Sequence, residues 1–418
     1  MKNTILIKLT VNIQLIILLS CDLLIHWLPL LEITTFPFNC LLWLCMAFGV
    51  LFIMQHKEEK KYGSAIKLWI VLYIIYTIYL IYYIFISPQV PRDDMLGISE
   101  SNFRFMLNTV ILFGAMLSCI LYRRFINVTA WTKATIIIIF LTSFLYFLKT
   151  NILLYSLYRH LLATDPDMLA EFGLVDSFTV DRAMGLCFFC NLWLMGRLTK
   201  SKWISYILFV IISVYCLIII ILIGQRGPIL FIITTTMFYF FCKYATSARK
   251  IILYIFMAVV MLIAGAFAVS YVSSDTAERF EEIEEDSGSG RFGDDDSEYF
   301  LAWNQIQEGP LLGSYFRTTA VGRYGDYPHN VILELFMTFG LIFTLPMLYL
   351  FFKIVKISFY QIRKNTDVTL YCLVFIYVLS CFMTSGTIAL NFFFWLLPPM
   401  IFAGGVSNAE HAVIKRKK

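Results

Sequence analysis

The stretch YPHNVILELFMTFGLIFTLPMLYL, residues 327–350, is the key to the fold. It joins the chain's one long polar segment, Ser273–Tyr327, to an apolar run of helical length. About 20 apolar residues are enough for a helix to cross the hydrocarbon core of a bilayer. His329 and Asn330 are therefore expected at the end of a membrane helix, with Glu334 one turn further in.

The rest of the chain has the composition of a membrane protein. Of its 418 residues, 60% are hydrophobic and 15% are charged, and the mean hydropathy is +0.77. A soluble domain so poor in polar residues cannot cover its surface, which excludes that class. We predict an all-α fold: a polytopic transmembrane bundle of about twelve helices, forming one integral-membrane domain over residues 1–418. The predicted spans are residues 5–30, 36–54, 66–86, 105–121, 134–154, 181–196, 204–223, 228–242, 251–272, 331–352, 368–387 and 390–406.

Lysine and arginine orient this bundle, because they accumulate on the cytoplasmic side of membrane proteins. With both termini cytoplasmic, the inner segments hold 23 of the 33 basic residues, including 17 of the 18 lysines. These segments include His56–Lys61, Tyr122–Lys133, Arg197–Lys202, Lys243–Lys250, Lys353–Lys364 and Lys415–Lys418. The outer side keeps Lys149 and nine arginines. Arginine binds phosphate or carboxylate in a bidentate manner. The alternative is pairing with outer acids, which we favour for Arg279.

Arg226 lies in the segment Gly224-Gln225-Arg226-Gly227-Pro228, which joins two predicted spans without room for a loop. Arg226 is therefore expected at the outer membrane boundary. Pro228 is typical of the first turn of a helix. Because a helix N-terminus favours anions, Arg226 and this terminus predict an anion site. The alternative is an arginine that extends to lipid headgroups.

A large periplasmic loop is predicted over residues 273–330. It contains an acidic run, 278–298, whose triple aspartate has no second cluster at metal-ligand spacing. We therefore predict no metal.

A helix is expected within this loop, from Ser297 to about Gln307. Its face of Tyr299, Phe300, Trp303 and Ile306 suits the membrane surface or the mouth of the bundle. Gly309-Pro310 is expected to end the helix.

His329 is the predicted general base. The positive end of a helix lowers the pKa of imidazole, which favours the neutral form that accepts a proton. Asn330 and Glu334 are expected to support it, as are the loop arginines Arg317 and Arg323.

Arg182 is a further supporting candidate, at the outer end of its span. It follows Asp181, and the two residues form either a salt bridge or part of a polar cavity.

Three motifs, in this order, resemble the bacterial O-antigen polymerase and O-antigen ligase superfamily. They are Gly-Gln-Arg-Gly at 224–227, Ser-Gly-Arg at 289–291 running into Trp303 and Gly309-Pro310-Leu311-Leu312-Gly313, and His-Asn-Val-Ile-Leu-Glu at 329–334 followed by Gly340. They cover about residues 220–350. The first half of the chain resembles the family only in span count and topology. The acidic run between Arg291 and Trp303 departs from the family pattern.

The resemblance implies a GT-C-like fold and a glycosyltransferase that uses undecaprenyl-diphosphate-linked sugar at the periplasmic face of the inner membrane. Its diphosphate-binding arginines would be Arg226 and Arg291, and its base His329. An inverting displacement with these residues requires neither a cofactor nor a metal.

Three functions then compete. We favour a polymerase that joins lipid-linked repeat units, with a chain-length regulator and a flippase as partners. A ligase would instead transfer the polymer to lipid A–core. A lipid-linked oligosaccharide flippase is a distant third, because charged residues deep in the spans are few and no internal repeat is evident.

Overall fold

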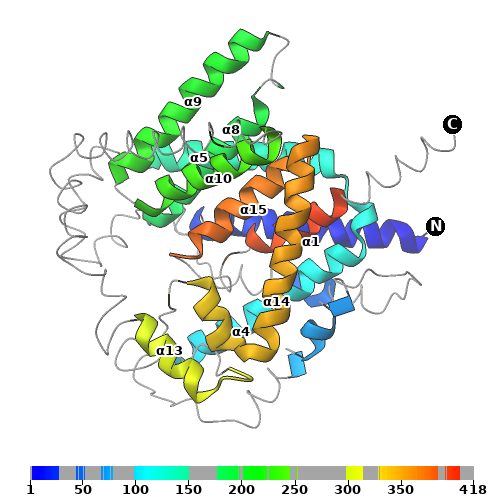
Figure 1. Ribbon diagram of the computed structural model, residues 1–418. Coiled ribbons are helices and arrows are strands. Elements are labelled where there is room, and N and C mark those ends of the chain that lie inside the picture. The colour runs from blue at the N-terminus through cyan, green and yellow to red at the C-terminus, as the bar shows by residue number, and fades with distance from the viewer. Residues whose placement is uncertain are drawn as a thin grey trace.

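The computed structural model describes residues 2–27, 44–45, 47–49, 51, 67–68, 70–75, 77–78, 98–149, 177–195, 197, 201–223, 226–244, 252, 298–313, 328, 330–384, 391 and 393–404. Within these residues all regular structure is helical (Figure 1). The helices are α1 (Lys2–Trp27), α4 (Ile98–Leu121), the short 3-10 helix η2 (Arg123–Phe125), α5 (Val128–Lys149), α8 (Ser177–Leu194), α9 (Lys202–Ile223), α10 (Arg226–Tyr244), α13 (Glu298–Glu308), α14 (Val331–Lys364) and α15 (Thr369–Cys381), followed by an apolar helix over Phe393–Gly404.

The helices follow the predicted apolar runs. Among the described residues, three segments are long and apolar enough to cross a membrane: Lys202–Ile221, Gly227–Tyr244 and Val331–Lys364. Shorter apolar helices are Ile5–Leu19, Val110–Leu121, Val128–Phe144, Thr369–Cys381 and Phe393–Gly404. The all-helical prediction is thus confirmed for the described residues, and the apolar helices suggest a membrane protein. The count of twelve and the GT-C-like arrangement stay predictions. Most of the predicted spans 36–54 and 251–272 lies outside the described residues.

α15 lies at the centre of the described bundle. It packs against α8, α10 and α14, and Tyr371, Phe375 and Tyr377 on it are fully buried. The ring of Phe394 packs against Phe375 at a centroid distance of 5.7 Å and against Phe382 at 5.4 Å. α15 therefore contacts three other helices of the bundle, and they can be located relative to its two ends.

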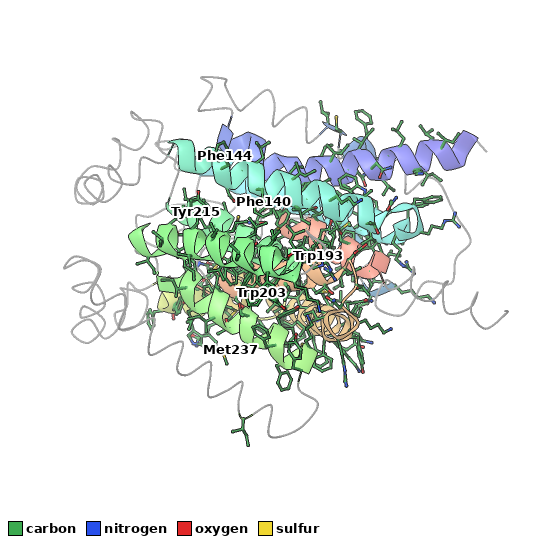
Figure 2. The ribbon with its side chains drawn as sticks, turned by 90° about the horizontal axis from the view of Figure 1, so that it is seen from above. Phe140, Phe144, Trp193, Trp203, Tyr215 and Met237 are labelled. Atoms are coloured by element: carbon green, nitrogen blue, oxygen red, sulfur yellow. The ribbon has the colours of Figure 1, made fainter. Side chains whose placement is uncertain are left out.

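The outer surface of the bundle is strongly apolar. Trp203 at the start of α9 is 78% exposed, and isoleucine, leucine and valine side chains follow it along the same helix. Figure 2 looks onto this region, where Phe144 of α5, Trp203 of α9 and Met237 of α10 are labelled. Water does not stabilise an apolar surface of this extent, whereas lipid does.

α14 differs from the predicted span 331–352. It runs on to Lys364, through a segment predicted as an inner loop, and it is broken at Gly340. Gly340 has φ 61° and ψ −173°, a conformation almost restricted to glycine. Figure 1 shows the helix changing direction near α13. The part after the break, 341–364, is about 36 Å long at about 1.5 Å per residue, enough to cross a bilayer by itself.

The break is occupied by the turn that follows α13, Gly309–Gly313. The N–H of Leu341 donates to the carbonyl of Pro310 at 2.8 Å. The N–H of Ile342 donates to the carbonyl of Leu311 at 3.2 Å. A new helix start has N–H groups without intrahelical acceptors, and these two carbonyls supply them.

Two glycines allow this approach. Gly313 has φ 72°, and a Cβ added to it would lie 2.6 Å from the backbone of Thr338 and of Gly340. A Cβ added to Gly340 would in turn collide with the backbone of Leu311 and Gly313. The second and third sequence motifs are therefore in direct backbone contact.

α13 confirms the predicted helix and its end at Gly309. Its packed face differs, however, because Ala302 and Gln305 are buried, whereas Phe300 and Trp303 are exposed. α13 packs on α14 through that smaller face. The aromatic residues point outward, as expected for a helix at a membrane surface.

Residues from three segments predicted on the inner side meet at one end of the bundle. The Arg197 guanidinium donates to the carbonyl and to the side-chain Oδ1 of Asn365, both at 2.9 Å. Thr129 donates to the carboxylate of Asp367 at 2.6 Å. The loop between α14 and α15 therefore lies beside the end of α8 and the start of α5.

We predict that Gly340→Ala and Gly313→Ala each strongly destabilise the protein. The positive φ alone costs about 1–3 kcal/mol, and the backbone collision adds to it. Thermal unfolding of the detergent-purified protein, followed by size-exclusion chromatography, measures the loss.

Gly309→Ala is the matched control in the same turn. Gly309 has no positive φ, and an added Cβ would approach the nearest backbone atom, the Gly313 carbonyl oxygen, at 3.2 Å. Its effect should be clearly smaller. Equal stability of all three variants would contradict the docking of the turn into the break.

Candidate functional site

The start of α14 docks onto the end of α15. The N–H of Val331 donates to the carbonyl of Phe382 at 2.7 Å. The side-chain amide of Asn330 donates to the carbonyl of Met383 at 3.3 Å. Carbonyls at the C-terminal end of a helix have no intrahelical donors, so the start of α14 supplies what the end of α15 lacks. We call Asn330, Val331, Phe382 and Met383 the α14–α15 junction; Figure 1 shows the two helix ends side by side.

Asn330 also caps α14. Its Oδ1 accepts from the N–H groups of Ile332 at 3.0 Å and Leu333 at 3.2 Å. Its carbonyl accepts from the N–H of Glu334 at 2.8 Å. Together with the Val331 bond, each of the first four N–H groups has an acceptor. An anion near this terminus can therefore interact with the helix dipole but finds no free N–H among residues 331–334.

The start of α10 reaches the same place. α10 begins at Arg226, only residues 224 and 225 separate it from α9, and Pro228 lies in its first turn, as predicted. Gly227 faces the residue after the junction: a Cβ added to it would lie 3.4 Å from the hydroxyl oxygen of Thr384. The starts of α10 and α14 thus both lie at the end of α15.

Arg182 of α8 is the described cation at this junction. Its guanidinium lies over the ring of Phe382, 5.7 Å from the centroid. Its Nε is buried and has no hydrogen-bond acceptor among the described residues. The salt bridge between Arg182 and Asp181 and the polar cavity both stay predictions.

Buried polar side chains continue inward from the junction. Glu334 is 1% exposed, one turn after Asn330. The hydroxyls of Thr338 on α14 and Thr235 on α10 are fully buried without a hydrogen-bond partner among the described residues. α10 and α14 pack against each other. Buried hydroxyls without partners cost free energy unless water or another polar group bonds to them.

The structure therefore brings together Arg182, Asn330, Glu334 and the backbone at Arg226. His329, Arg291, Arg317 and Arg323 lie outside the described residues, as does the Arg226 side chain. The chain neighbours of His329 on both sides are described: Pro328 is buried, and Asn330 is the cap of α14.

Three residues of this site were not predicted: Phe382, Met383 and Thr384. Two of them contribute backbone carbonyls, which any residue type provides. The available signal is weak: a polar cluster, Thr384-Ser385-Gly386, inside an apolar run.

Comparison of the chain with protein-family models, with curated proteins and with solved structures gives no match.

We predict that Asn330→Asp separates the two roles of Asn330. Aspartate keeps the oxygens that cap Ile332 and Leu333, but it cannot donate to the carbonyl of Met383. Asn330→Ala loses both roles, so it should lower the free energy of unfolding by more than an ordinary helix cap contributes, which is about 1 kcal/mol. Asn330→Asp should therefore be destabilised less than Asn330→Ala, and thermal unfolding of both variants measures this difference in stability.

Asn127→Ala is the matched control, because Asn127 caps α5 at the opposite end of the bundle by accepting from Ala130 at 3.2 Å. It should cost only the cap. If Asn330→Ala and Asn127→Ala are equally stable, the side-chain bond to Met383 contributes nothing.

Proposed function

We propose that the chain is an integral-membrane glycosyltransferase that polymerises O-antigen or a related surface polysaccharide at the periplasmic face of the inner membrane. One observation carries the proposal: the starts of α10 and α14 meet at the end of α15, beside Arg182. This places the first residue of α10, Arg226, and the residue that follows His329 at one junction. The proposal further rests on the three-motif resemblance.

The donor in this proposal is an oligosaccharide on undecaprenyl diphosphate. A hydroxyl of the acceptor sugar attacks the donor's anomeric carbon, and His329 accepts the hydroxyl proton. The bond between that carbon and the diphosphate oxygen breaks, and its electron pair leaves with undecaprenyl diphosphate. Direct displacement of this kind inverts the anomeric centre.

The arginines stabilise the charge that develops on the leaving diphosphate. The backbone of α14 does not take this role, because its first four N–H groups are all bonded. The proposal therefore assigns the diphosphate to Arg226 and Arg291, with Arg182 beside them. Guanidinium groups bind phosphate oxygens in pairs and stay charged in a partly dry site.

The buried polar groups inside the junction support the proposal as well. An acceptor that presents several sugar hydroxyls needs hydrogen-bond partners. Thr338 of α14 and Thr235 of α10 offer such partners, and Glu334 lies one helical turn before Thr338 on α14. Glu334 is a candidate to position the imidazole.

A ligase shares this donor chemistry and differs only in its acceptor, lipid A–core. The two functions separate in cells that lack the gene. Loss of a polymerase leaves a single repeat unit on the core, whereas loss of a ligase leaves the core without any repeat.

We expect His329→Ala to lower the rate by about 10²–10⁴, the usual contribution of a general base. The variant should still fold and bind lipid-diphosphate donor, because the arginines remain. A purified assay with lipid-linked repeat units, paired with donor-binding measurements, separates the two steps. Normal polymerisation would exclude His329 as the base, and lost donor binding would make it a diphosphate ligand instead.

The wild-type rate should also fall towards acidic pH. The unperturbed pKa of histidine is about 6.5, and the protonated imidazole cannot accept a proton. The same polymerisation assay, run over a range of pH, measures the decline.

We expect Arg226→Lys and Arg291→Lys each to lose most activity at normal protein levels. Lysine keeps the charge but loses the two parallel donors that hold a phosphate. The same polymerisation assay measures this, with Arg279→Lys as the control, since its expected partners are solvated acids and its activity should be nearly unchanged. If either of the first two variants makes wild-type polymer, that arginine contacts lipid headgroups or loop acids and does not bind the diphosphate.

A further inference from the structure

The exposed surface of α13 and the following turn is apolar. Neither the packing of the bundle nor the proposed chemistry explains these apolar side chains. Trp303 is 53% exposed and Leu311 is 58% exposed. Phe300 and Leu312 are exposed beside them. The same unit packs on α14 through the buried Ala302, whereas these four side chains are exposed. We call Phe300, Trp303, Leu311 and Leu312 the α13 surface.

The α13 surface continues an apolar face of α14. Leu341, Ile342 and Leu345 are exposed on α14, within a segment long and apolar enough to cross a membrane. The backbone bonds from Leu341 to Pro310 and from Ile342 to Leu311 hold the turn directly beside this face. The depth of α14 in a bilayer therefore also sets the depth of the turn.

The charge of α13 indicates a neutral interface. Its only charged residues are Glu298 and Glu308, at its two ends. Gln307 is exposed near the aromatic residues. Tryptophan beside amide side chains is typical of the headgroup boundary, where one end of the indole is apolar and the other is wet. A helix without lysine or arginine gains nothing from anionic lipids.

We propose that the α13 surface lies in the lipid bilayer, with Trp303 at the headgroup boundary. The partner is the lipid itself, because the surface is continuous with the lipid-suited face of α14. α13 then holds the Gly309–Gly313 turn at a fixed depth. Through the bonds from Leu341 and Ile342 to this turn, it also helps to position α14. This inference concerns the bilayer alone and does not depend on the sugar chemistry.

The test uses the full chain labelled with 5-fluorotryptophan in phosphatidylcholine nanodiscs, with one copy in each disc. The ¹⁹F resonance of Trp303 is assigned from the Trp303→Phe variant. Its relaxation is measured with a spin-labelled lipid and, separately, with a water-soluble gadolinium chelate. Trp395, which is 2% exposed, is the internal control that neither probe should reach.

We expect the spin-labelled lipid to relax Trp303 severalfold more than it relaxes Trp395, with a much weaker effect of the chelate. The result should be the same with and without phosphatidylglycerol. Relaxation by the chelate alone would place Trp303 in water and overturn the proposal. Relaxation by neither probe would mean that another part of the protein covers the α13 surface, which also overturns it. Folding is monitored in the same spectra by the Trp395 resonance, and polymerisation activity is not part of the readout.

Discussion

Backbone N–H groups at a helix start need acceptors, and within an apolar bundle water does not supply them. α14 meets this requirement twice. Its first start, at Asn330, is bonded by its own cap and by the carbonyl of Phe382 at the end of α15. Its second start, after Gly340, is bonded by the carbonyls of Pro310 and Leu311. In each set, acceptors from a distant part of the sequence take part: Phe382 at the first start, Pro310 and Leu311 at the second. These bonds help to determine where α14 lies.

This constraint also divides the tasks within the candidate site. Because the N–H groups of residues 331–334 are all bonded, they offer no donor to an anion. In the proposed mechanism arginines hold the anion, and the buried Nε of Arg182 has no acceptor among the described residues. The same bonds hold Asn330, the residue that directly follows His329 in the chain. The proposed mechanism has a proton acceptor beside a cationic site, the combination that transfer from a diphosphate donor requires.

Much of this arrangement follows from local sequence patterns. Apolar runs predict the helices, Pro228 predicts the first turn of α10, and Gly309-Pro310 predicts the end of α13. The break at Gly340 was not predicted, because the apolar run continues across it and its acceptors lie about 30 residues earlier. The bond from Asn330 to Met383 was not predicted either. It depends on a backbone carbonyl, whose position comes from the packing of α15 and not from the type of residue.

The central claim is that the start of α10 lies at the end of α15, beside the start of α14. A disulfide between Gly227→Cys and Thr384→Cys tests it directly, because a Cβ at position 227 would lie 3.4 Å from the Thr384 hydroxyl oxygen. A cysteine at position 384 can carry its Sγ close to the position of that hydroxyl oxygen, within reach of the Sγ of a cysteine at position 227. The linked peptide can be identified by mass spectrometry with the native cysteines in place. Gly227→Cys with Thr366→Cys, at the other end of α15, is the control pair. We predict rapid cross-linking of the first pair and none of the control; an unlinked first pair, or equal linking of both, would contradict the account.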